Sequence, residues 1–161
     1  MKTYSYDRRY ASRHYYHGTS GDFTEFELSE AGARDFGDFG LGIYLTPSSV
    51  LARTYAYASA KKTGREPKVL VVNVRVRKTA DVDDPDLQKR IADATGAPFP
   101  KRLTGGPQTR PRSEATAITR FLQSGGYDSA LGRGGKELVV FDPHLLSIER
   151  SVPAEEAGYL I

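Results

Sequence analysis

Tyr15–Thr19 reads Tyr-Tyr-His-Gly-Thr, an aromatic run that stops abruptly at small and polar residues. Such a run is typical of a short β-strand that ends at a polar edge. A strand end is rigid, so it can present chemical groups to a ligand in fixed positions. His17 can hydrogen-bond a ligand through either ring nitrogen, and Gly18 lacks a Cβ atom, so a ligand can approach its backbone closely. Alone, the run indicates only a strand followed by a turn, and its interpretation depends on the rest of the chain.

The composition narrows the class of protein. A chain of 161 residues is long enough for one domain with a substantial core, and 39% hydrophobic residues argue against disorder. The absence of cysteine excludes a disulfide scaffold, a thiol nucleophile and a cysteine zinc site. The net charge of +3 is compatible with a phosphate-bearing partner, but the basic residues are too dispersed to indicate one.

The two ends of the chain differ in character from its middle. Residues 1–13 read as a basic N-terminal arm, residues 14–152 as the globular domain and residues 153–161 as a loosely attached C-terminal tail. The arm lacks the apolar segment of a Sec-type signal peptide, and no apolar run approaches the roughly 18 residues that a membrane-spanning helix needs. We therefore expect a cytoplasmic protein with no membrane partner, and delivery into a target cell stays open.

The chain mixes strands and helices without the regular strand–helix–strand repeat of a parallel sheet, which favours an α+β fold with mainly antiparallel pairing. One strand alternates strictly over 68–77 and is expected to be buried on one face only. A glycine-rich loop over 32–42 lacks the spacing of a dinucleotide-binding fingerprint and is interpreted as a flexible surface loop. The other elements that we predict are helices over 47–62, 86–95 and 113–124, strands over 14–19, 43–45, 127–131, 137–141 and 145–148, and a long loop over 98–111.

The helix over 47–62 is predicted in more detail. Thr46 is expected as its N-cap and Pro47 as its first residue. Residues three or four positions apart share one helix face, so an apolar face is expected at Leu51, Tyr55 and Ala58.

Tyr44 and Tyr55 can form an aromatic slot. They are eleven residues apart, which in the helix is close to three turns, so Tyr55 can oppose Tyr44 across a gap. Two aromatic faces suit a flat ring, and a cationic ring gains about 0.5–2 kcal/mol from each face. Taken singly, each tyrosine is more typical of a core or rim position.

Glu137 is a lone carboxylate at the start of an apolar strand, directly after a glycine-rich loop. The strand would fix its position and the loop would form a mobile lip beside it, although such a residue is more often an exposed charge at a strand edge. The preceding glycines do not form a phosphate-binding loop, because the required spacing is absent. His14 and His17 would point to opposite faces of their strand, so we expect no metal site.

Four short motifs now follow one another in a characteristic order. They are His-Gly-Thr at 17–19, Gly-Ile-Tyr-Leu-Thr at 42–46, Gly-Tyr-Asp at 126–128 and Glu-Leu-Val-Val-Phe-Asp-Pro at 137–143. Together they resemble the diphtheria-toxin-like and poly(ADP-ribose)polymerase-like branch of the ADP-ribosyltransferases, the His-Tyr-Glu class. The resemblance covers about residues 14–150 and is greatest to small bacterial and phage-associated transferase domains.

The resemblance implies a split β-sandwich of two small, mainly antiparallel sheets with flanking helices, and NAD as a co-substrate in the cleft between the sheets. By position, His17 would bond the adenosine-side ribose, and the backbone of Gly18 would hold the nicotinamide carboxamide. Tyr44 and Tyr55 would sandwich the nicotinamide ring, and Glu137 would bond the 2′-hydroxyl of its ribose. The implied catalytic residues are Glu137, His17 and Tyr44, and the implied NAD-binding residues are His17, Gly18, Thr19, Tyr44 and Tyr55.

The implied activity is mono-ADP-ribosylation by an effector or toxin, which could have an antidote partner. The arginine-modifying branch of the superfamily carries an arginine on its first strand and an acidic or amide residue two positions before the glutamate. Here those positions look like His17 and Gly135, so we do not expect arginine as the acceptor. The loop before Glu137, over 132–136, is basic and glycine-rich, which favours a phosphate-bearing or acidic protein or nucleic-acid acceptor.

Three alternatives stay open at this point. The chain is also similar to small-molecule transferases of the rifamycin-inactivating kind, which begin with a like Tyr-His-Gly-Thr. A related enzyme could hydrolyse NAD with water as the acceptor. A degenerate family member could serve only as an NAD-binding or interaction module.

Overall fold

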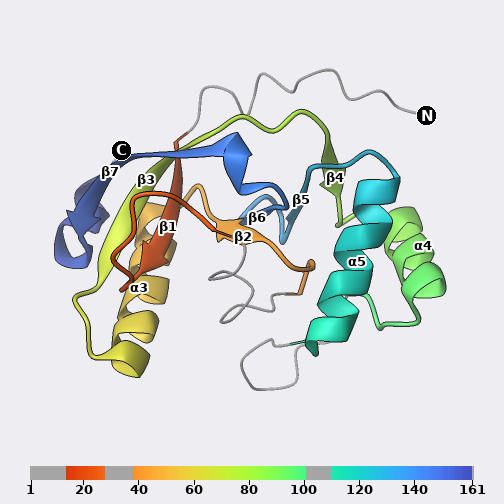
Figure 1. Cartoon of the computed structure of the whole chain (residues 1–161), viewed down its shortest axis with the longest axis horizontal. Helices are drawn as coiled ribbons and strands as arrows, with labels where there is room; N and C mark the ends of the chain where they lie inside the picture. Colours follow the sequence, from red (N-terminus) through yellow and green to blue (C-terminus); the bar gives the residue numbers. More distant parts are fainter. Residues whose placement is uncertain (1–13, 28–37, 101–109, 161) are drawn as a thin grey trace. The chain divides into compact units, whose positions relative to one another are not determined.

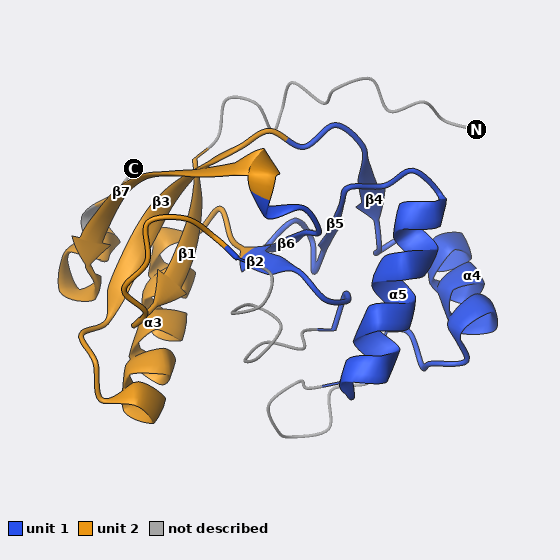
Figure 2. Ribbon diagram, viewed as in Figure 1, with its two compact units in different colours: residues 1–6, 27–44, 76–143 blue, residues 7–26, 45–75, 144–161 orange. Residues whose placement is uncertain are grey.

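The structure is a computed structural model that describes residues 14–27, 38–100 and 110–160 (Figure 1). The expected N-terminal arm, most of the glycine-rich loop and the middle of the proline-rich loop lie outside the described residues. The chain divides into two compact units, which are coloured separately in Figure 2. Unit 1 comprises residues 1–6, 27–44 and 76–143, and unit 2 comprises residues 7–26, 45–75 and 144–161.

Unit 2 is a three-stranded antiparallel sheet covered by one helix. The strand order is β1-β3-β7 (Figure 1). Gly18 of β1 lies opposite Val69 of β3. The elements are β1 (Tyr15–Thr19), α3 (Ser49–Thr63), β3 (Lys68–Val74), β7 (Leu146–Pro153) and the short 3-10 helix η2 (Ala154–Tyr159). The core between the sheet and the helices is formed by Tyr16, Ala52, Ala56, Val69, Val71, Ala154 and Ala157.

β3 is the middle strand of this sheet, and it is more deeply buried than its alternating sequence predicts. Val69 and Val71 pack toward α3, while Leu70 and Val72 on the opposite face are also at most 2% exposed. The expectation that one face would be exposed is therefore wrong, because a central strand can be covered on both sides. The strand also ends at Val74, before the predicted limit at residue 77.

α3 begins two residues later than predicted. Its N-cap is Ser48, whose side chain accepts a hydrogen bond from the Leu51 backbone N–H at 3.1 Å. Thr46 is not the cap, because its backbone is instead bonded to Tyr16, with N···O distances of 2.8 and 3.0 Å. The buried face is also different from the predicted one and consists of the small residues Ser49, Ala52 and Ala56.

The small residues allow α3 to lie directly on β1. A Cβ atom on Gly18 would be 1.9 Å from the carbonyl oxygen of Ala52 and 2.7 Å from the nitrogen of Ala56. Both atoms belong to the helix backbone and cannot rotate away. Gly18 is therefore required by the packing of the helix, in addition to any role in binding a ligand.

The C-terminal residues are part of unit 2, so the expectation of a loosely attached tail is wrong for them. In η2, Ala154 and Ala157 are buried in the core against α3. The Ala154 backbone N–H also donates to the Pro67 carbonyl at 3.1 Å. Ala154 and Ala157 are three residues apart, so this short helix can bury one side. Two alanines among polar residues do not distinguish such a helix from an exposed tail in the sequence alone.

Unit 1 is a four-stranded sheet with the order β2-β6-β5-β4, packed against two helices. β5 pairs with β6 in the antiparallel sense, and β4, which the sequence did not predict, pairs with β5 in the parallel sense. The predicted helices over 86–95 and 113–124 are confirmed as α4 and α5. The elements are β2 (Ile43–Leu45), β4 (Thr79–Asp81), α4 (Pro85–Thr95), α5 (Arg112–Ser124), β5 (Ser129–Gly132), β6 (Glu137–Val140) and η1 (Pro143–Leu145).

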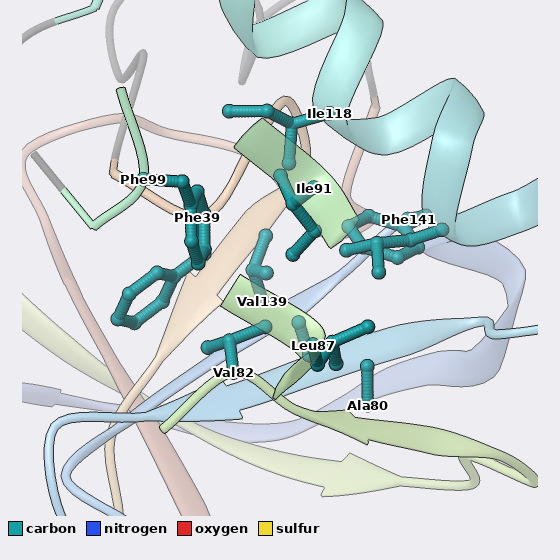
Figure 3. Packing of buried hydrophobic residues seen from close by; sticks show 11 residues of the cluster. Phe39, Ala80, Val82, Leu87, Ile91, Phe99, Ile118, Val139 and Phe141 are labelled. Carbon is teal, nitrogen blue, oxygen red and sulfur yellow. The ribbon is translucent and has the colours of Figure 1, made fainter. Parts of the chain in front are cut away.

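The core of unit 1 fills the space between the sheet and the two helices. Figure 3 shows side chains from β6, α4 and α5, among them Val139, Ile91 and Ile118, converging on one apolar cluster. Phe39 and Phe99 close one end of it, with ring centroids 6.2 Å apart. The α+β class with two mainly antiparallel sheets is thus confirmed, and no helix among the described residues has the length and apolarity needed to cross a membrane.

Arg110 is a buried cation at the edge of this core. Its side chain donates to the Asp38 carbonyl and carboxylate, both at 2.8 Å, and to the Pro98 carbonyl at 2.6 Å. Its guanidinium carbon also lies 5.3 Å from the centroid of the Phe99 ring. A buried arginine with several bonds of this kind fixes the backbone around it, here the turn that begins at Asp38.

Replacing Gly18 by alanine should destabilise the protein, because the added methyl group collides with the backbone of α3. Overpacking of this kind costs about 1–3 kcal/mol, which corresponds to a fall in Tm of roughly 2–4 °C for each kcal/mol in a chain of this length. The control is Gly158→Ala, whose added Cβ would meet only the movable guanidinium of Arg53. Equal melting temperatures for the two variants in thermal unfolding would contradict the packing described for Gly18.

Replacing Arg110 by methionine should cost about 3–5 kcal/mol, because it leaves the buried Asp38 carboxylate without its cation. Urea unfolding followed by circular dichroism would measure the loss. The exposed Arg112, two residues away, provides the matched control, and Arg112→Met should unfold like the parent. If the Arg110 variant were as stable as the Arg112 variant, the buried pair would have no structural importance.

Candidate active site

His17 lies in the middle of β1, on the face of the sheet away from α3. Tyr16 faces α3, and successive side chains of a strand alternate between faces, so His17 faces the other way. Its half-buried ring packs edge-on against Phe26 and Phe23, with centroid distances of 5.1 and 6.5 Å. The two phenylalanines therefore restrain the orientation of the histidine ring.

The backbone of Gly18 faces the outer edge of the sheet. The N–H and C=O groups of Tyr16 bond to Thr46, so they point away from β3. Backbone direction alternates along an antiparallel pair, and Gly18 is two residues further along β1, so its N–H and C=O groups also point away from β3. A donor and an acceptor that lie side by side at a strand edge can bind a carboxamide group.

Thr19 stabilises the turn at the end of β1. Its hydroxyl accepts a hydrogen bond from the Gly21 N–H at 2.9 Å, and the residue is 8% exposed. The bond closes the turn that follows the strand. This turn leads to Phe23, whose ring packs over Gly21 and stands beside His17.

Tyr55 lies on the flank of α3 and is not a core residue, since it is 46% exposed. It directly precedes Ala56, whose backbone nitrogen lies against Gly18. Neighbouring residues of a helix are about 100° apart around its axis, so Tyr55 stands beside the buried face rather than within it. His17, Gly18, Thr19 and Tyr55 are all carried by unit 2.

Tyr44 is held by a turn of unit 1. Its hydroxyl donates to the Gly40 carbonyl at 2.5 Å and accepts from the Phe39 N–H at 3.2 Å. Its partly buried ring packs against the core of unit 1. The turn that holds it is the one anchored by Arg110 through Asp38.

Glu137 is the first residue of β6, and β6 lies next to β2 in the sheet. Val139, two residues further along β6, belongs to the same core that Tyr44 packs against. Because side chains two apart on a strand share a face, Tyr44 and Glu137 lie on the same face of neighbouring strands. The Glu137 side chain is 17% exposed, so it is not the solvated strand-edge charge that the alternative interpretation described.

The loop before Glu137 is held in place, which contradicts the expectation of a mobile lip. The carboxylate of Asp83 accepts hydrogen bonds from the backbone N–H groups of Arg133 and Gly134, at 3.0 and 2.8 Å. The Nε atom of Arg133 lies 3.0 Å from Oε2 of Glu137. The sequence indicated neither contact and showed only that the loop over 132–136 is basic and rich in glycine.

The predicted site residues therefore fall into two groups. Unit 1 brings Tyr44 and Glu137 onto one sheet face, and unit 2 brings His17, Gly18 and Tyr55 around β1 and α3. The predicted clamping of one ring between Tyr44 and Tyr55 joins residues of different units and stays a prediction. Within the described residues, no group of three His, Asp or Glu side chains is placed to hold a metal ion.

Residues 12–149 match the family described as "ADP-Ribosyltransferase in polyvalent proteins". No curated protein matches the chain. These residues include all four motifs on which the resemblance was based.

The fold is similar to that of a chain in the crystal structure of the M. tuberculosis MbcT–MbcA toxin–antitoxin complex. The two chains share 17% sequence identity with a TM-score of 0.56, and the match covers 92% of this chain and 90% of that one. At this identity the likeness concerns the fold alone. An anti-CRISPR protein matches over 88% of this chain and 98% of its own, at 12% identity and a TM-score of 0.37, which is too low to support an argument.

The family match extends over most of the chain and contains every predicted site residue. It confirms the resemblance that the four motifs indicated. The chain belongs to the ADP-ribosyltransferase family of polyvalent proteins.

Proposed function

We propose that the protein transfers ADP-ribose from NAD to an acceptor and releases nicotinamide. The observation that carries this proposal is the placement of Tyr44 and Glu137 on one face of neighbouring strands, each held by its own contacts. An aromatic ring and a carboxylate side by side suit a cationic ring attached to a sugar. Family membership supports the same reaction.

The chemistry needs little acid catalysis. In NAD the nicotinamide ring is cationic, so when the bond between its nitrogen and C1′ of the ribose breaks, the ring takes both electrons and leaves as neutral nicotinamide. The sugar then has oxocarbenium character, as in glycoside cleavage. The acceptor attacks C1′ and gives up one proton.

Glu137 would act at the sugar. Its carboxylate would accept a hydrogen bond from the ribose 2′-hydroxyl and stabilise the positive charge that develops at C1′, which is most effective in a site with little water. It can also receive the proton of the acceptor. Its limited exposure of 17% supports this role.

β1 would bind the rest of NAD. The outward-facing N–H and C=O groups of Gly18 match the oxygen and the amino group of the nicotinamide carboxamide. His17 would bond the adenosine-side ribose, oriented by Phe23 and Phe26. Thr19 would contribute by closing the turn that keeps these groups at the strand end.

Tyr44 and Tyr55 would contact the two faces of the nicotinamide ring. Tyr44 is fixed by two hydrogen bonds of its hydroxyl, so it would be the rigid wall of the slot. Tyr55 is carried on the flank of α3, where 46% of it is exposed. Each face would contribute about 0.5–2 kcal/mol to binding the cationic ring and less to neutral nicotinamide, which favours release of the product.

The acceptor that we propose is a protein or a nucleic acid, and the group that is modified is not an arginine side chain. The protein would act as a toxin or effector in the cytoplasm. The structural neighbour comes from a toxin–antitoxin complex, and by analogy we propose an antidote partner for this chain. Arg133 is engaged with Glu137, so the basic loop would meet an acidic or phosphate-bearing acceptor mainly through the exposed Lys136.

Glu137→Gln should reduce nicotinamide release from NAD by about 10²- to 10⁴-fold, because the amide keeps the shape of the side chain but not its charge. The measurement is nicotinamide formation by chromatography, with calorimetry to verify that NAD still binds. The matched control is Glu66→Gln, an exposed carboxylate in unit 2, which should behave like the parent. A Glu137 variant as active as the parent would refute the proposed role.

The same assay with labelled NAD and a cell lysate separates the possible acceptors. Label that is removed by protease or by nuclease identifies a protein or a nucleic acid, as proposed. Free ADP-ribose alone would mean that water is the acceptor. Tight NAD binding without nicotinamide release by the parent would leave only an NAD-binding module.

A further inference from the structure

We propose that Arg133 and Asp83 are positioning residues that fix the carboxylate of Glu137. The inference rests on the proposed function, in which Glu137 acts on NAD. Neither Arg133 nor Asp83 needs to touch NAD for this role, since each acts through the next residue in a chain of contacts. All three residues belong to unit 1.

The first contact is between Arg133 and Glu137. The Nε atom of the guanidinium lies 3.0 Å from Oε2, and the two side chains are 38% and 17% exposed. The contact is an ion pair rather than a hydrogen bond, and partial burial reduces the screening of the pair by salt. The contact restrains the terminal torsion of the glutamate, which is otherwise only weakly confined.

The second contact fixes Arg133 itself. The backbone of Arg133 has a φ of 54°, in the left-handed region that residues with a side chain rarely adopt. Gly134 and Gly135 follow with φ values of 67° and 86°, so three successive residues share this conformation. Successive N–H groups in such a loop form a concave site for an anion, and the Asp83 carboxylate occupies it with one oxygen on Arg133 and the other on Gly134.

The third contact connects the loop over 132–136 to the turn that holds Tyr44. The guanidinium carbon of Arg133 lies 5.8 Å from the centroid of the Phe39 ring. The same ring packs so closely on Gly132 that a Cβ atom there would be 2.5 Å from it. The Phe39 N–H in turn donates to the Tyr44 hydroxyl. One turn therefore contacts both the loop that orients Glu137 and the tyrosine beside it.

A carboxylate fixed in this way presents the same oxygen lone pairs to the ribose hydroxyl in every encounter. Correct orientation of reacting groups contributes substantially to rate, and a misplacement of about 1 Å can cost roughly 100-fold. The ion pair itself is not required for NAD to bind. Its loss should therefore lower kcat and leave KM nearly unchanged.

The test compares nicotinamide release by four variants of the contact and one control variant. Arg133→Met should lower kcat by about 10- to 100-fold with KM for NAD within about twofold of the parent. Arg133→Lys keeps the charge but not the planar group, so it should recover only part of the rate. Asp83→Ala should lower kcat less, and the double variant should match Arg133→Met, because the two residues act in series. The control Arg120→Met removes an exposed arginine of α5 and should match the parent.

The outcomes separate this inference from the proposed function. If the parent released no nicotinamide, the proposed function would fail, and the positioning role would fail with it. If the parent were active and Arg133→Met were equally active, only the positioning role would be overturned. A faster Arg133 variant would also overturn it, because the ion pair would then restrain Glu137 rather than orient it.

A second measurement tests the contact without catalysis. In an NMR spectrum of the parent, the Nε–H signal of Arg133 should be distinct, because this group lies 3.0 Å from the partly buried carboxylate of Glu137. Glu137→Gln should shift the signal markedly and Arg120→Met should not. An Arg133 signal that is unaffected by Glu137→Gln would show that the pair does not form in solution.

Discussion

The direct contact between Gly18 and the backbone of α3 is the constraint on which the arrangement of unit 2 depends. It exists because glycine on the strand meets alanines on the helix, and any larger side chain at Gly18 would push the two apart. Two consequences follow for function. First, the outward-facing backbone of Gly18 and the side chain of Tyr55 both lie close to the contact between β1 and α3. Second, the His17 ring lies on the opposite face of the strand, where it packs against aromatic rings.

In unit 1, ion pairs and hydrogen bonds to charged groups fix the positions of Tyr44 and Glu137, as backbone packing fixes Gly18 in unit 2. Arg110 is buried on Asp38 and thereby fixes the turn that bonds the Tyr44 hydroxyl, while Asp83 fixes the loop that brings Arg133 to Glu137. Buried or half-buried charges are costly unless they are paired, so each of these pairs also specifies one arrangement of the chain against others.

Local signals in the sequence predicted the elements that depend on local chemistry. Gly96, with a φ of 71°, ends α4 at the predicted limit, and Gly125 and Gly126 follow the last residue of α5. The cap Asp84 and the first residue Pro85 lie just before the start of α4 that was predicted at residue 86. Features decided by tertiary contacts were not predicted. The sequence Thr-Pro-Ser-Ser at 46–49 offers several possible N-caps for α3, and only the backbone bonds between Thr46 and Tyr16 exclude Thr46. The motifs indicated the candidate site residues, but Asp38 and Arg110 are 72 residues apart, and no sequence period reveals such a pair.

The measurement that tests the central claim most directly is an NMR titration of isotopically labelled protein with nicotinamide. If the edge of β1 binds the carboxamide, the Gly18 amide signal should shift strongly as the ligand saturates, because its N–H gains an acceptor. Gly64, at the exposed end of α3, should give an unchanged signal. A Gly18 signal that stays in place while calorimetry shows nicotinamide bound would contradict the assignment of β1 as the NAD-binding strand.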